Sequence, residues 1–253
     1  MQNLPSPLDL LLDPISLIVL AIYAGLMIWE AVLPARKLPH VKNWKIKGII
    51  SFLIFFFLSS YLPMFIDPFI APYMLFDLSA LGTFWSALIG IVGYQLVVYL
   101  YHRSVHKSNA LWRVFHQMHH SAERIDTYGA FYFSPTDMIS FTLVGSLVFA
   151  LFIGLPPEAV TPVILILNFL SIFQHANIKT PLWIGYIIQR PESHAVHHAR
   201  GIHAHNYSDL PIWDLVFGTF KNPKTYEYEN GFFDGSSGKV KEMLLFKDIN
   251  KAS

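Results

Sequence analysis

Three long apolar stretches constrain the fold of this 253-residue chain more than any other feature of its sequence. They cover residues 14–33, 48–66 and 78–101, and each is close to the 20 apolar residues that a helix needs to cross a bilayer. A bilayer core offers the backbone no hydrogen-bond partners, so isolated spanning segments of this kind must be helical. We therefore predict three membrane-spanning helices in the first 101 residues.

A fourth apolar region, residues 138–173, is too long for one crossing and contains the pair Pro156-Pro157. Because a proline inside a helix removes a hydrogen bond and clashes with the preceding turn, this pair predicts a hairpin with arms at 139–155 and 159–173. Only 14% of the residues are charged, against about a quarter in an average soluble domain. The predicted fold is an all-α integral membrane bundle of about four to five membrane helices, with a helical cap outside the bilayer.

Basic residues are distributed unevenly along the chain, and this predicts its orientation. No Lys or Arg precedes Arg36, five lie in the loop 34–47, and none occurs from residue 48 to residue 102. By the positive-inside rule, this loop and the cap face the cytoplasm, in a bacterial inner membrane or an endoplasmic reticulum membrane. The N-terminus lacks the basic region and cleavage site of a secretory signal, so we interpret the first apolar stretch as a retained helix.

Histidines are concentrated in one part of the chain. Eleven of the twelve lie between His102 and His205, whereas His40 stands apart and is interpreted as a surface residue. Eight of the eleven form an HxxxH group and two HxxHH groups: His102 and His106; His116, His119 and His120; His194, His197 and His198. The chain has no cysteine, so a bound metal would be held by nitrogen and oxygen ligands.

The spacing of these groups has a physical meaning. On a helix, residues three or four apart lie on one face, with Cβ atoms about 5–6 Å apart. HxxxH therefore gives one pair of imidazoles, and HxxHH adds a neighbour, turned by about 100°, that can reach a second point. Eight imidazoles exceed the four ligands of one tetrahedral zinc, so we predict two metal ions with three or four protein ligands each. Imidazole suits Zn, Fe, Cu and Ni alike, so the ligands do not name the metal.

Further candidates lie near these groups. His175 stands at the end of the apolar hairpin, where the chain returns to the cap, and we predict it as an additional ligand. Other polar residues are candidates either as metal ligands or as hydrogen-bond partners that orient the ligand histidines. They are His203, His205, Asn206, Glu123, Asp126 and Asp137.

The order of the histidine groups on an integral membrane chain resembles the fatty acid hydroxylase and sterol desaturase superfamily, over roughly residues 85–220. The likeness extends to Tyr101-His102-Arg103, to Trp112 ahead of His116, to Asn206-Tyr207, and to Trp213-Asp214-Leu215-Val216-Phe217-Gly218-Thr219. Many members have four residues between the first two histidines. The three found here are similar to branches that include alkylglycerol monooxygenase and bacterial sterol-desaturase-like proteins.

The resemblance implies a lipid oxidase that uses O₂ and two iron ions, for which zinc can substitute in a purified sample. The implied metal ligands are the eight grouped histidines, with His175 matching a less regular histidine of the family. A membrane lipid is the implied substrate, and ferredoxin, cytochrome b5 or a reductase is the implied electron donor. Hydroxylation, desaturation and ether cleavage all stay open. The net charge of +1 gives no general attraction to nucleic acid.

The sequence argues against two other functions. A zinc-dependent hydrolase would need a general base near the metal, but the sequence has no HExxH and no obvious glutamate beside the ligands. A metal transporter or other non-enzymatic metal-binding protein would carry ionisable residues through its membrane helices, and the first three hold almost none. We divide the chain into membrane helices at 1–101, a catalytic region at 102–220 and a polar tail at 221–253, within one structural domain.

Overall fold

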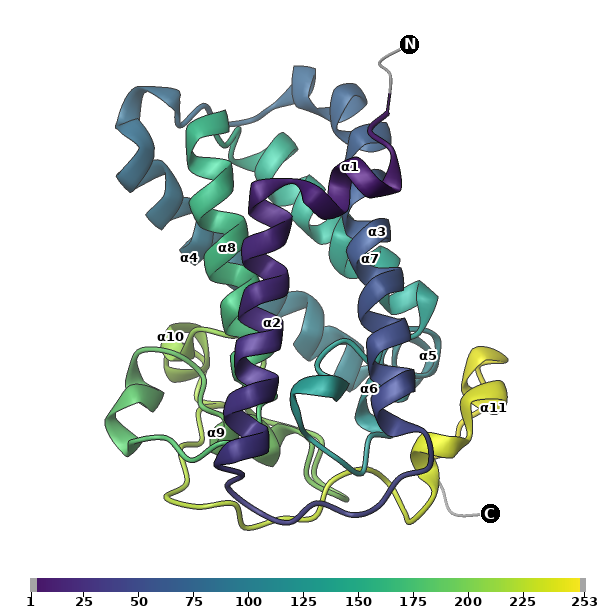
Figure 1. Ribbon diagram of the computed structural model, residues 1–253. Helices are drawn as coiled ribbons and strands as arrows, with labels where there is room; N and C mark the ends of the chain where they lie inside the picture. Colours follow the sequence, from purple (N-terminus) through teal and green to yellow (C-terminus); the bar gives the residue numbers. More distant parts are fainter. Residues whose placement is uncertain (1–3, 251–253) are drawn as a thin grey trace.

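The computed structural model describes residues 4–250 as helices joined by loops (Figure 1). Within this range the only strand-like pairing is an isolated bridge between Ala199 and Asn230, so the all-α prediction is confirmed. The α-helices are α1 (Pro7–Leu12), α2 (Pro14–Val32), α3 (Trp44–Ile70), α4 (Gly82–Lys107), α5 (Asn109–Leu111), α6 (Gln117–His120), α7 (Pro135–Ser146), α8 (Pro157–Phe173), α9 (Pro191–His197), α10 (Pro211–Val216) and α11 (Val240–Leu244). The 3₁₀ segments are η1 (Ala71–Tyr73), η2 (Ser79–Leu81), η4 (Thr127–Gly129), η6 (Leu182–Tyr186) and η7 (Ser236–Gly238), and the π-helical segments are η3 (Trp112–His116) and η5 (Leu147–Phe152).

Four helical segments are long and apolar enough to cross a membrane, and α8 is a shorter fifth one. The four are Pro14–Val32, Trp44–Tyr73, Ser79–Lys107 and Pro135–Phe152. At most 33% of the residues in their most apolar windows are buried inside the protein, so most apolar side chains there face outward. A surface of this kind is suited to lipid rather than to water. The predicted membrane bundle is confirmed, including the hairpin at 139–173.

Local sequence explains where the hairpin turns. The π-helical end of its first arm leads to Gly154, which has a positive φ of 57°. A Cβ at this position would clash with the backbone carbonyl oxygen of Phe76, so only glycine fits the turn. The second arm, α8, then begins with Pro157 at its first position, where the missing N–H costs no helical hydrogen bond.

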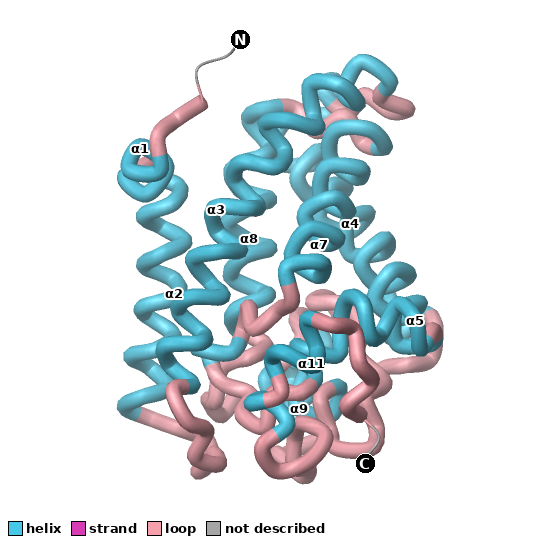
Figure 2. The backbone as a smooth tube through the Cα atoms, turned by 90° about the vertical axis from the view of Figure 1, so that its right-hand side faces the viewer, coloured by secondary structure: helices cyan, strands magenta, loops and turns pink. Residues whose placement is uncertain are grey.

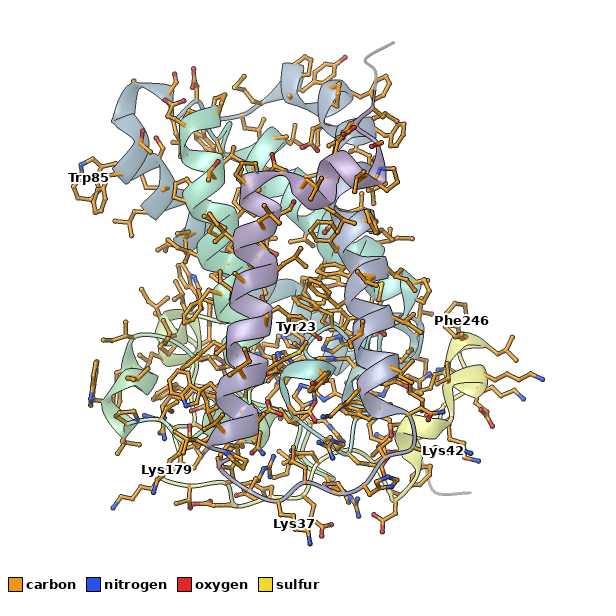
Figure 3. The ribbon with its side chains drawn as sticks, viewed as in Figure 1. Tyr23, Lys37, Lys42, Trp85, Lys179 and Phe246 are labelled. Atoms are coloured by element: carbon orange, nitrogen blue, oxygen red, sulfur yellow. The ribbon has the colours of Figure 1, made fainter. Side chains whose placement is uncertain are left out.

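The helices pack in a bundle in which α3 lies against α7, and α8 lies against both α2 and α4. A buried aromatic cluster joins α2 and α3 to the ends of later segments. Tyr23 of α2, which lies between α2 and α3 in Figure 3, stacks on Phe52 of α3 with ring centroids 4.3 Å apart. Phe56, Phe131 and Phe173 also belong to this cluster. The cluster includes Ala176, which directly follows His175 in the chain.

Loops and short helices gather at the end of the bundle opposite the N-terminus and form the cap (Figure 2). Helix α4, at 26 residues, is about 39 Å long and exceeds a bilayer core of about 30 Å. Its last turns, with His102 and His106, therefore extend toward the cap. Phe232 and Met243 of the C-terminal tail belong to the same buried cluster as Trp112. The division into three segments stays a prediction.

One buried carboxylate ties the membrane helices to the cap. Glu30, near the end of α2, accepts hydrogen bonds from the backbone N–H of Thr127 at 2.8 Å and of Asn177 at 2.9 Å. The Thr127 hydroxyl donates a third bond at 2.8 Å. These partners follow the first HxxHH group and His175 respectively. Glu30 therefore fixes two histidine-bearing segments against one membrane helix.

Candidate metal centre

Nine histidines from separate parts of the chain meet in two clusters in the cap. Within each cluster, one ligand atom of every histidine lies within 4.8 Å of those of the others, and each cluster can hold a metal ion. The first histidine cluster comprises His102, His106, His116, His120 and His197. The second histidine cluster comprises His119, His175, His194 and His198. All nine residues predicted from the sequence as metal ligands are thus brought together.

The two HxxHH groups divide between the clusters in opposite ways. In the first group, His116 and His120 point to the first cluster and His119 to the second. In the second group, His194 and His198 belong to the second cluster, and the middle histidine belongs to the first. An i, i+4 pair with its i+3 neighbour turned aside therefore reaches two centres from each segment. The π-helical segment η3, which ends at His116, is a helix irregularity that is frequent at functional sites.

In the first cluster, three rings are oriented by backbone carbonyls. Each accepts a hydrogen bond from an Nδ1–H, and all three belong to one short stretch of chain, residues 203–207. The pairs are His102 with Tyr207 (2.8 Å), His106 with His203 (2.8 Å) and His197 with His205 (2.7 Å). This proton arrangement leaves a lone pair on each Nε2, the atom that faces the centre of the cluster.

The remaining two rings of the first cluster are held by side chains. The Nδ1 of His116 lies 2.8 Å from a carboxylate oxygen of the fully buried Asp137. The Nδ1 of His120 lies 3.1 Å from the Nδ1 of His203. The Nε2 atoms of both rings are buried and have no hydrogen-bond partner within residues 4–250. Buried nitrogens of this kind call for a ligand, because an unpaired buried polar atom is costly.

The spacing of the Nε2 atoms fits a bound cation. The Nε2 of His102 lies 3.1 Å from that of His106 and 3.0 Å from that of His197. Three lone pairs this close repel one another unless a positive ion lies among them. Imidazole nitrogens bonded to a metal at about 2.1 Å and at right angles would be about 3.0 Å apart. The residues present therefore suit a divalent metal ion.

The second cluster has a similar spacing but different surroundings. Its Nε2 atoms form a chain: His119 to His175 at 3.1 Å, His175 to His194 at 2.9 Å, and His194 to His198 at 3.1 Å. His175 donates from Nδ1 to the carbonyl of Ser171 at 2.7 Å. The Nδ1 of His194 lies 2.9 Å from the side-chain amide nitrogen of Gln189. That amide nitrogen also contacts an oxygen of Gln174.

Burial keeps these imidazoles neutral. It lowers the pKa of His119, His120 and His198 well below the usual value of 6.5, and neighbouring imidazoles lower it further. Burial lowers the pKa of His175 to about 4, although the bond to the Ser171 carbonyl partly opposes this. The neutral ring is the form that binds a metal, so no proton has to leave these rings at pH 7.

A cavity of about 90 Å³ lies beside both clusters. One wall is apolar and comes mainly from the membrane helices and the segment after the first HxxHH group. It contains Phe55, Tyr94, Val98, Ala130, Phe131, Phe133 and Phe141. Polar residues also line the cavity, among them Gln174, Gln189 and Asp209. The carboxylate of Asp209 accepts bonds from Gln174 at 2.7 Å and from Gln95 at 2.8 Å, and its pKa is raised by burial.

Other residues named from the sequence lie beside the clusters or outside them. His203, His205 and Asn206 belong to neither cluster, although the first two provide carbonyls that orient ligand rings. The Glu123 carboxylate accepts from the backbone N–H groups of Gly235 and Ser237. That of Asp126 accepts from Trp44, Gly129 and Arg124. These bonds assign both carboxylates to holding the cap together.

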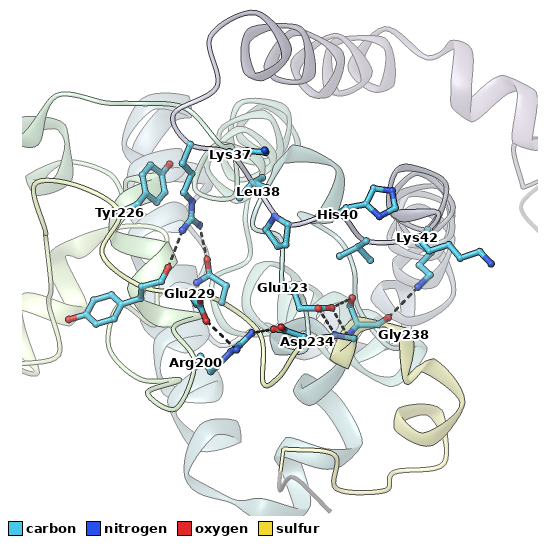
Figure 4. Close-up of a pocket in the computed structure, with 18 of the residues that line it drawn as sticks. Lys37, Leu38, His40, Lys42, Glu123, Arg200, Tyr226, Glu229, Asp234 and Gly238 are labelled. Carbon is cyan, nitrogen blue, oxygen red and sulfur yellow. Dashed lines mark hydrogen bonds and ion pairs between the residues drawn. The ribbon is translucent and has the colours of Figure 1, made fainter.

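A groove of about 730 Å³ runs between the loop 34–47 and the C-terminal tail (Figure 4). Charges of both signs line it: the basic residues Arg36, Lys37, Lys42, Lys47 and Arg200, and the acidic residues Glu123, Glu227, Glu229 and Asp234. Arg200 pairs with Glu229 and Asp234, whereas the other four basic residues pair with no carboxylate within residues 4–250. Asn230 lines the groove and donates from its side chain to the carbonyl of Ala195, on the helix that carries His194 and His197. The groove therefore adjoins the outer side of α9.

The fold and the site define a membrane protein with several apolar spanning helices and two buried histidine clusters that can each hold a metal ion. A family model described as fatty acid hydroxylase matches residues 87–219, which is more than half of the chain. The chain belongs to the fatty acid hydroxylase family, and the predicted resemblance is confirmed.

Three curated proteins of this kind are similar to the chain. Alkylglycerol monooxygenase from Homo sapiens is 35% identical over 157 residues, 59% of this chain and 33% of that protein. Ornithine lipid hydroxylase OlsE from Rhizobium tropici is 27% identical over 143 residues, 55% of this chain and 43% of that protein. Sphinganine C4-monooxygenase 2 from Arabidopsis thaliana is 26% identical over 155 residues, 56% of each protein. The chain thus spans about a third to just over half of these relatives, and no solved structure matches it significantly.

Proposed function

We propose that this protein is an O₂-dependent membrane lipid oxidase with two iron ions, one in each histidine cluster. The observation that carries the proposal is the convergence of Nε2 lone pairs at 3.0–3.1 Å in a buried, neutral cluster, which suits a cation and little else. Membership of the fatty acid hydroxylase family favours iron over the other metals that imidazole binds. Two iron ions held there would supply the activation of O₂.

The reaction that fits best is hydroxylation of a C–H bond. In balanced form, a lipid C–H, O₂, two electrons and two protons give a lipid alcohol and water. The three similar proteins are named as a hydroxylase of ornithine lipid and monooxygenases of alkylglycerol and sphinganine, which favours this outcome over desaturation. We therefore propose a lipid with a polar head and a long apolar chain as substrate.

The residues of the chain would position the substrate beside the metals and exclude water from the site. The apolar wall, including Phe131, Phe133 and Phe141, can hold a hydrocarbon segment beside both clusters and exclude water. Asp137 and the carbonyls of residues 203–207 keep a proton on the Nδ1 atoms and so keep each Nε2 free for a metal.

The proposal is tested by loading the full chain with Fe²⁺ and analysing lipids from cells that express it. We expect about two iron ions per chain and one lipid class that gains the mass of one oxygen atom. A His102→Ala variant should lack the metal of the first histidine cluster and should form no product. One tightly bound zinc, with no bound iron and no oxidised lipid, would support a hydrolase instead.

We also propose that the clusters lie on the cytoplasmic side of the membrane. The basic loop 34–47 and the cap lie at the same end of the bundle, where Lys37, Lys42 and Lys179 are seen in Figure 3. The positive-inside rule puts such an end in the cytoplasm. A reporter fused after Ser253 should therefore be active only on that side, and an external signal would reverse the assignment.

Electrons must come from a partner, and we propose that it docks in the groove of Figure 4. The expected partner carries a one-electron redox centre and presents acidic groups to Lys37 and Lys42. These two lysines have no carboxylate partner within residues 4–250, whereas Glu229 and Asp234 of the same groove pair with Arg200. The groove adjoins α9, so a carrier bound there would be close to the histidines of that helix.

Charge reversal tests this docking site. The double variant Lys37→Glu/Lys42→Glu should raise the KM for reduced ferredoxin or cytochrome b5, while turnover with a chemical reductant stays unchanged. Lys179→Glu, at the same end of the molecule but outside the groove, is the matched control. Equal KM values for the double variant and the native chain would exclude the groove.

A further inference from the structure

Residues 203–207 form a loop with an unusual backbone. His203, His205 and Asn206 all have positive φ values, of 41°, 69° and 49°. Residues with side chains seldom adopt this left-handed region, and they do so when the surrounding structure holds them there. The same loop supplies the three carbonyls that orient His102, His106 and His197.

The side chain of Asn206 holds the loop from the inside. It is fully buried, and its amide nitrogen donates to the carbonyls of Ser193 and Lys221, each at 2.8 Å. Its amide oxygen accepts from the backbone N–H of Lys221 at 2.8 Å. The backbone N–H of Asn206 donates to the carbonyl of Thr219. Asn206 thus joins the loop to α9 and to the segment after α10.

Asp214 of α10 holds the far end of the loop. Its fully buried carboxylate accepts from the backbone N–H groups of Tyr207 at 2.9 Å and Ser208 at 3.2 Å. The hydroxyl of Thr219 donates to it at 2.6 Å. Neither Asp214 nor the Asn206 side chain forms a hydrogen bond with a histidine of the two clusters. Asp214 is connected to the ligand rings through the loop, and Asn206 is connected to them through the loop and through Ser193 of α9.

We propose that Asn206 and Asp214 are positioning residues for the first histidine cluster. They hold the 203–207 loop so that its carbonyls accept hydrogen bonds from the ligand rings, and they thereby determine the affinity of this cluster for its metal ion. His205 contributes its carbonyl to the site and not its ring. This inference rests on the proposed two-metal function and deepens it. The physical reason is that a ring without an acceptor at Nδ1 can move its proton to Nε2, which removes the lone pair from the metal.

Two substitutions at His205 separate a role of the carbonyl from a role of the ring. Glycine accepts a φ of 69° readily and keeps the carbonyl in place, whereas valine disfavours that conformation strongly. We expect His205→Gly to bind metal at the first cluster as the native chain does. We expect His205→Val to bind it about 10- to 100-fold more weakly, the usual effect of losing a partner of a ligand histidine.

The measurement is a Co²⁺ titration of the full chain, stripped of metal, in which the absorption spectrum reports the ligands. A His119→Ala background disables the second cluster and isolates the first. Asp214→Asn provides an independent variant, because its amide would face two N–H donors. In the His119→Ala background, Asp214→Asn should lower the Co²⁺ affinity of the first cluster as His205→Val does. In a chain that carries Asp214→Asn alone, the second cluster should still bind Co²⁺.

The outcomes are distinct. Loss of Co²⁺ in His205→Gly would show that the ring is a ligand and would overturn the inference. Native affinity in both His205→Val and Asp214→Asn would overturn it as well. A native chain that binds fewer than two Co²⁺ ions would instead overturn the proposed function on which the inference rests.

Discussion

The two histidine clusters differ in how firmly the protein holds their rings. In the first cluster every Nδ1 has a partner: three carbonyls, the carboxylate of Asp137 and the ring of His203. In the second, His175 bonds a carbonyl, but the Nδ1 of His194 faces an amide nitrogen. The Nδ1 of His198 has no hydrogen-bond partner within residues 4–250.

Because of this difference, we expect the two clusters to have different roles. A cluster of five rings with fixed tautomers is preorganised and should bind its metal tightly. A cluster of four rings with looser support leaves more room for an external ligand. Three of the four rings of the second cluster line the cavity, namely His119, His175 and His194, against two of the five rings of the first cluster, His102 and His116. We therefore expect the first site to be the more structural one and the second to respond more to what occupies the cavity.

The largest expected effect comes from removing a ligand. His102→Ala and His119→Ala should each lower the oxidised lipid product more than about 100-fold, because each removes a ligand rather than a partner of one. Metal analysis should show which cluster has lost its ion. His40→Ala, in neither cluster, should retain both metals. Full product formation by either cluster variant would remove that cluster from the reaction.

A smaller effect is expected from the carboxylate beside the first cluster. Asp137→Leu leaves the Nδ1–H of His116 without an acceptor and should weaken metal binding there about 10- to 100-fold. The Co²⁺ titration in the His119→Ala background measures this directly. An unchanged affinity would mean that the carboxylate does not set the tautomer of His116.

The next effect concerns pH. Burial lowers the pKa of His175 and of His203 to about 4 in the folded chain, against 6.5 without burial. Between these values the unfolded state binds more protons, so the stability of the metal-free chain should fall as pH falls from 6.5 to 4. Each histidine should change the folding equilibrium by up to about tenfold per pH unit.

Chemical unfolding of the metal-free chain in detergent, at pH 7 and at pH 5, measures this dependence. The variant His203→Gln removes one of the histidines whose pKa is lowered and should reduce the slope. A stability that does not change over this range would contradict the burial of neutral rings in the cap.

The smallest effect is expected beside the second cluster. Gln189→Leu removes the amide that faces His194, but no carbonyl or carboxylate acceptor is lost from that ring. Metal affinity at the second cluster should change less than about tenfold, below the usual range for partners of ligand histidines. A loss of metal affinity as large as that expected for Asp137→Leu would show that the rings of the two clusters are supported equally.

Much of the fold followed from local sequence signals. Apolar length predicted the spanning helices, and Pro156-Pro157 predicted the hairpin, because both act on the backbone where they occur. The spacing of HxxHH also predicted that one segment could reach two points. The distribution of five and four histidines was not predictable, since it depends on how α4, α6 and α9 pack against one another.

The support of the rings was the least visible feature in the sequence. Every residue has a backbone carbonyl, so the sequence cannot show which carbonyl orients a ligand ring. The sequence made the side chains of His203 and His205 candidates, whereas in the structure their backbone oxygens accept the hydrogen bonds from ligand rings. Glu123 and Asp126 stood closer to the histidines in sequence than Asp137 does to its partner, yet it is Asp137 that contacts His116. The Asn206 and Asp214 motif residues gave the one available signal for this loop.

The most direct test is the location of the metals in the iron-loaded full chain. Anomalous diffraction at the iron edge should give two peaks, one among the Nε2 atoms of His102, His106 and His197 and the other among those of His119, His175 and His194. A single peak, or peaks outside both clusters, would contradict the two-metal account.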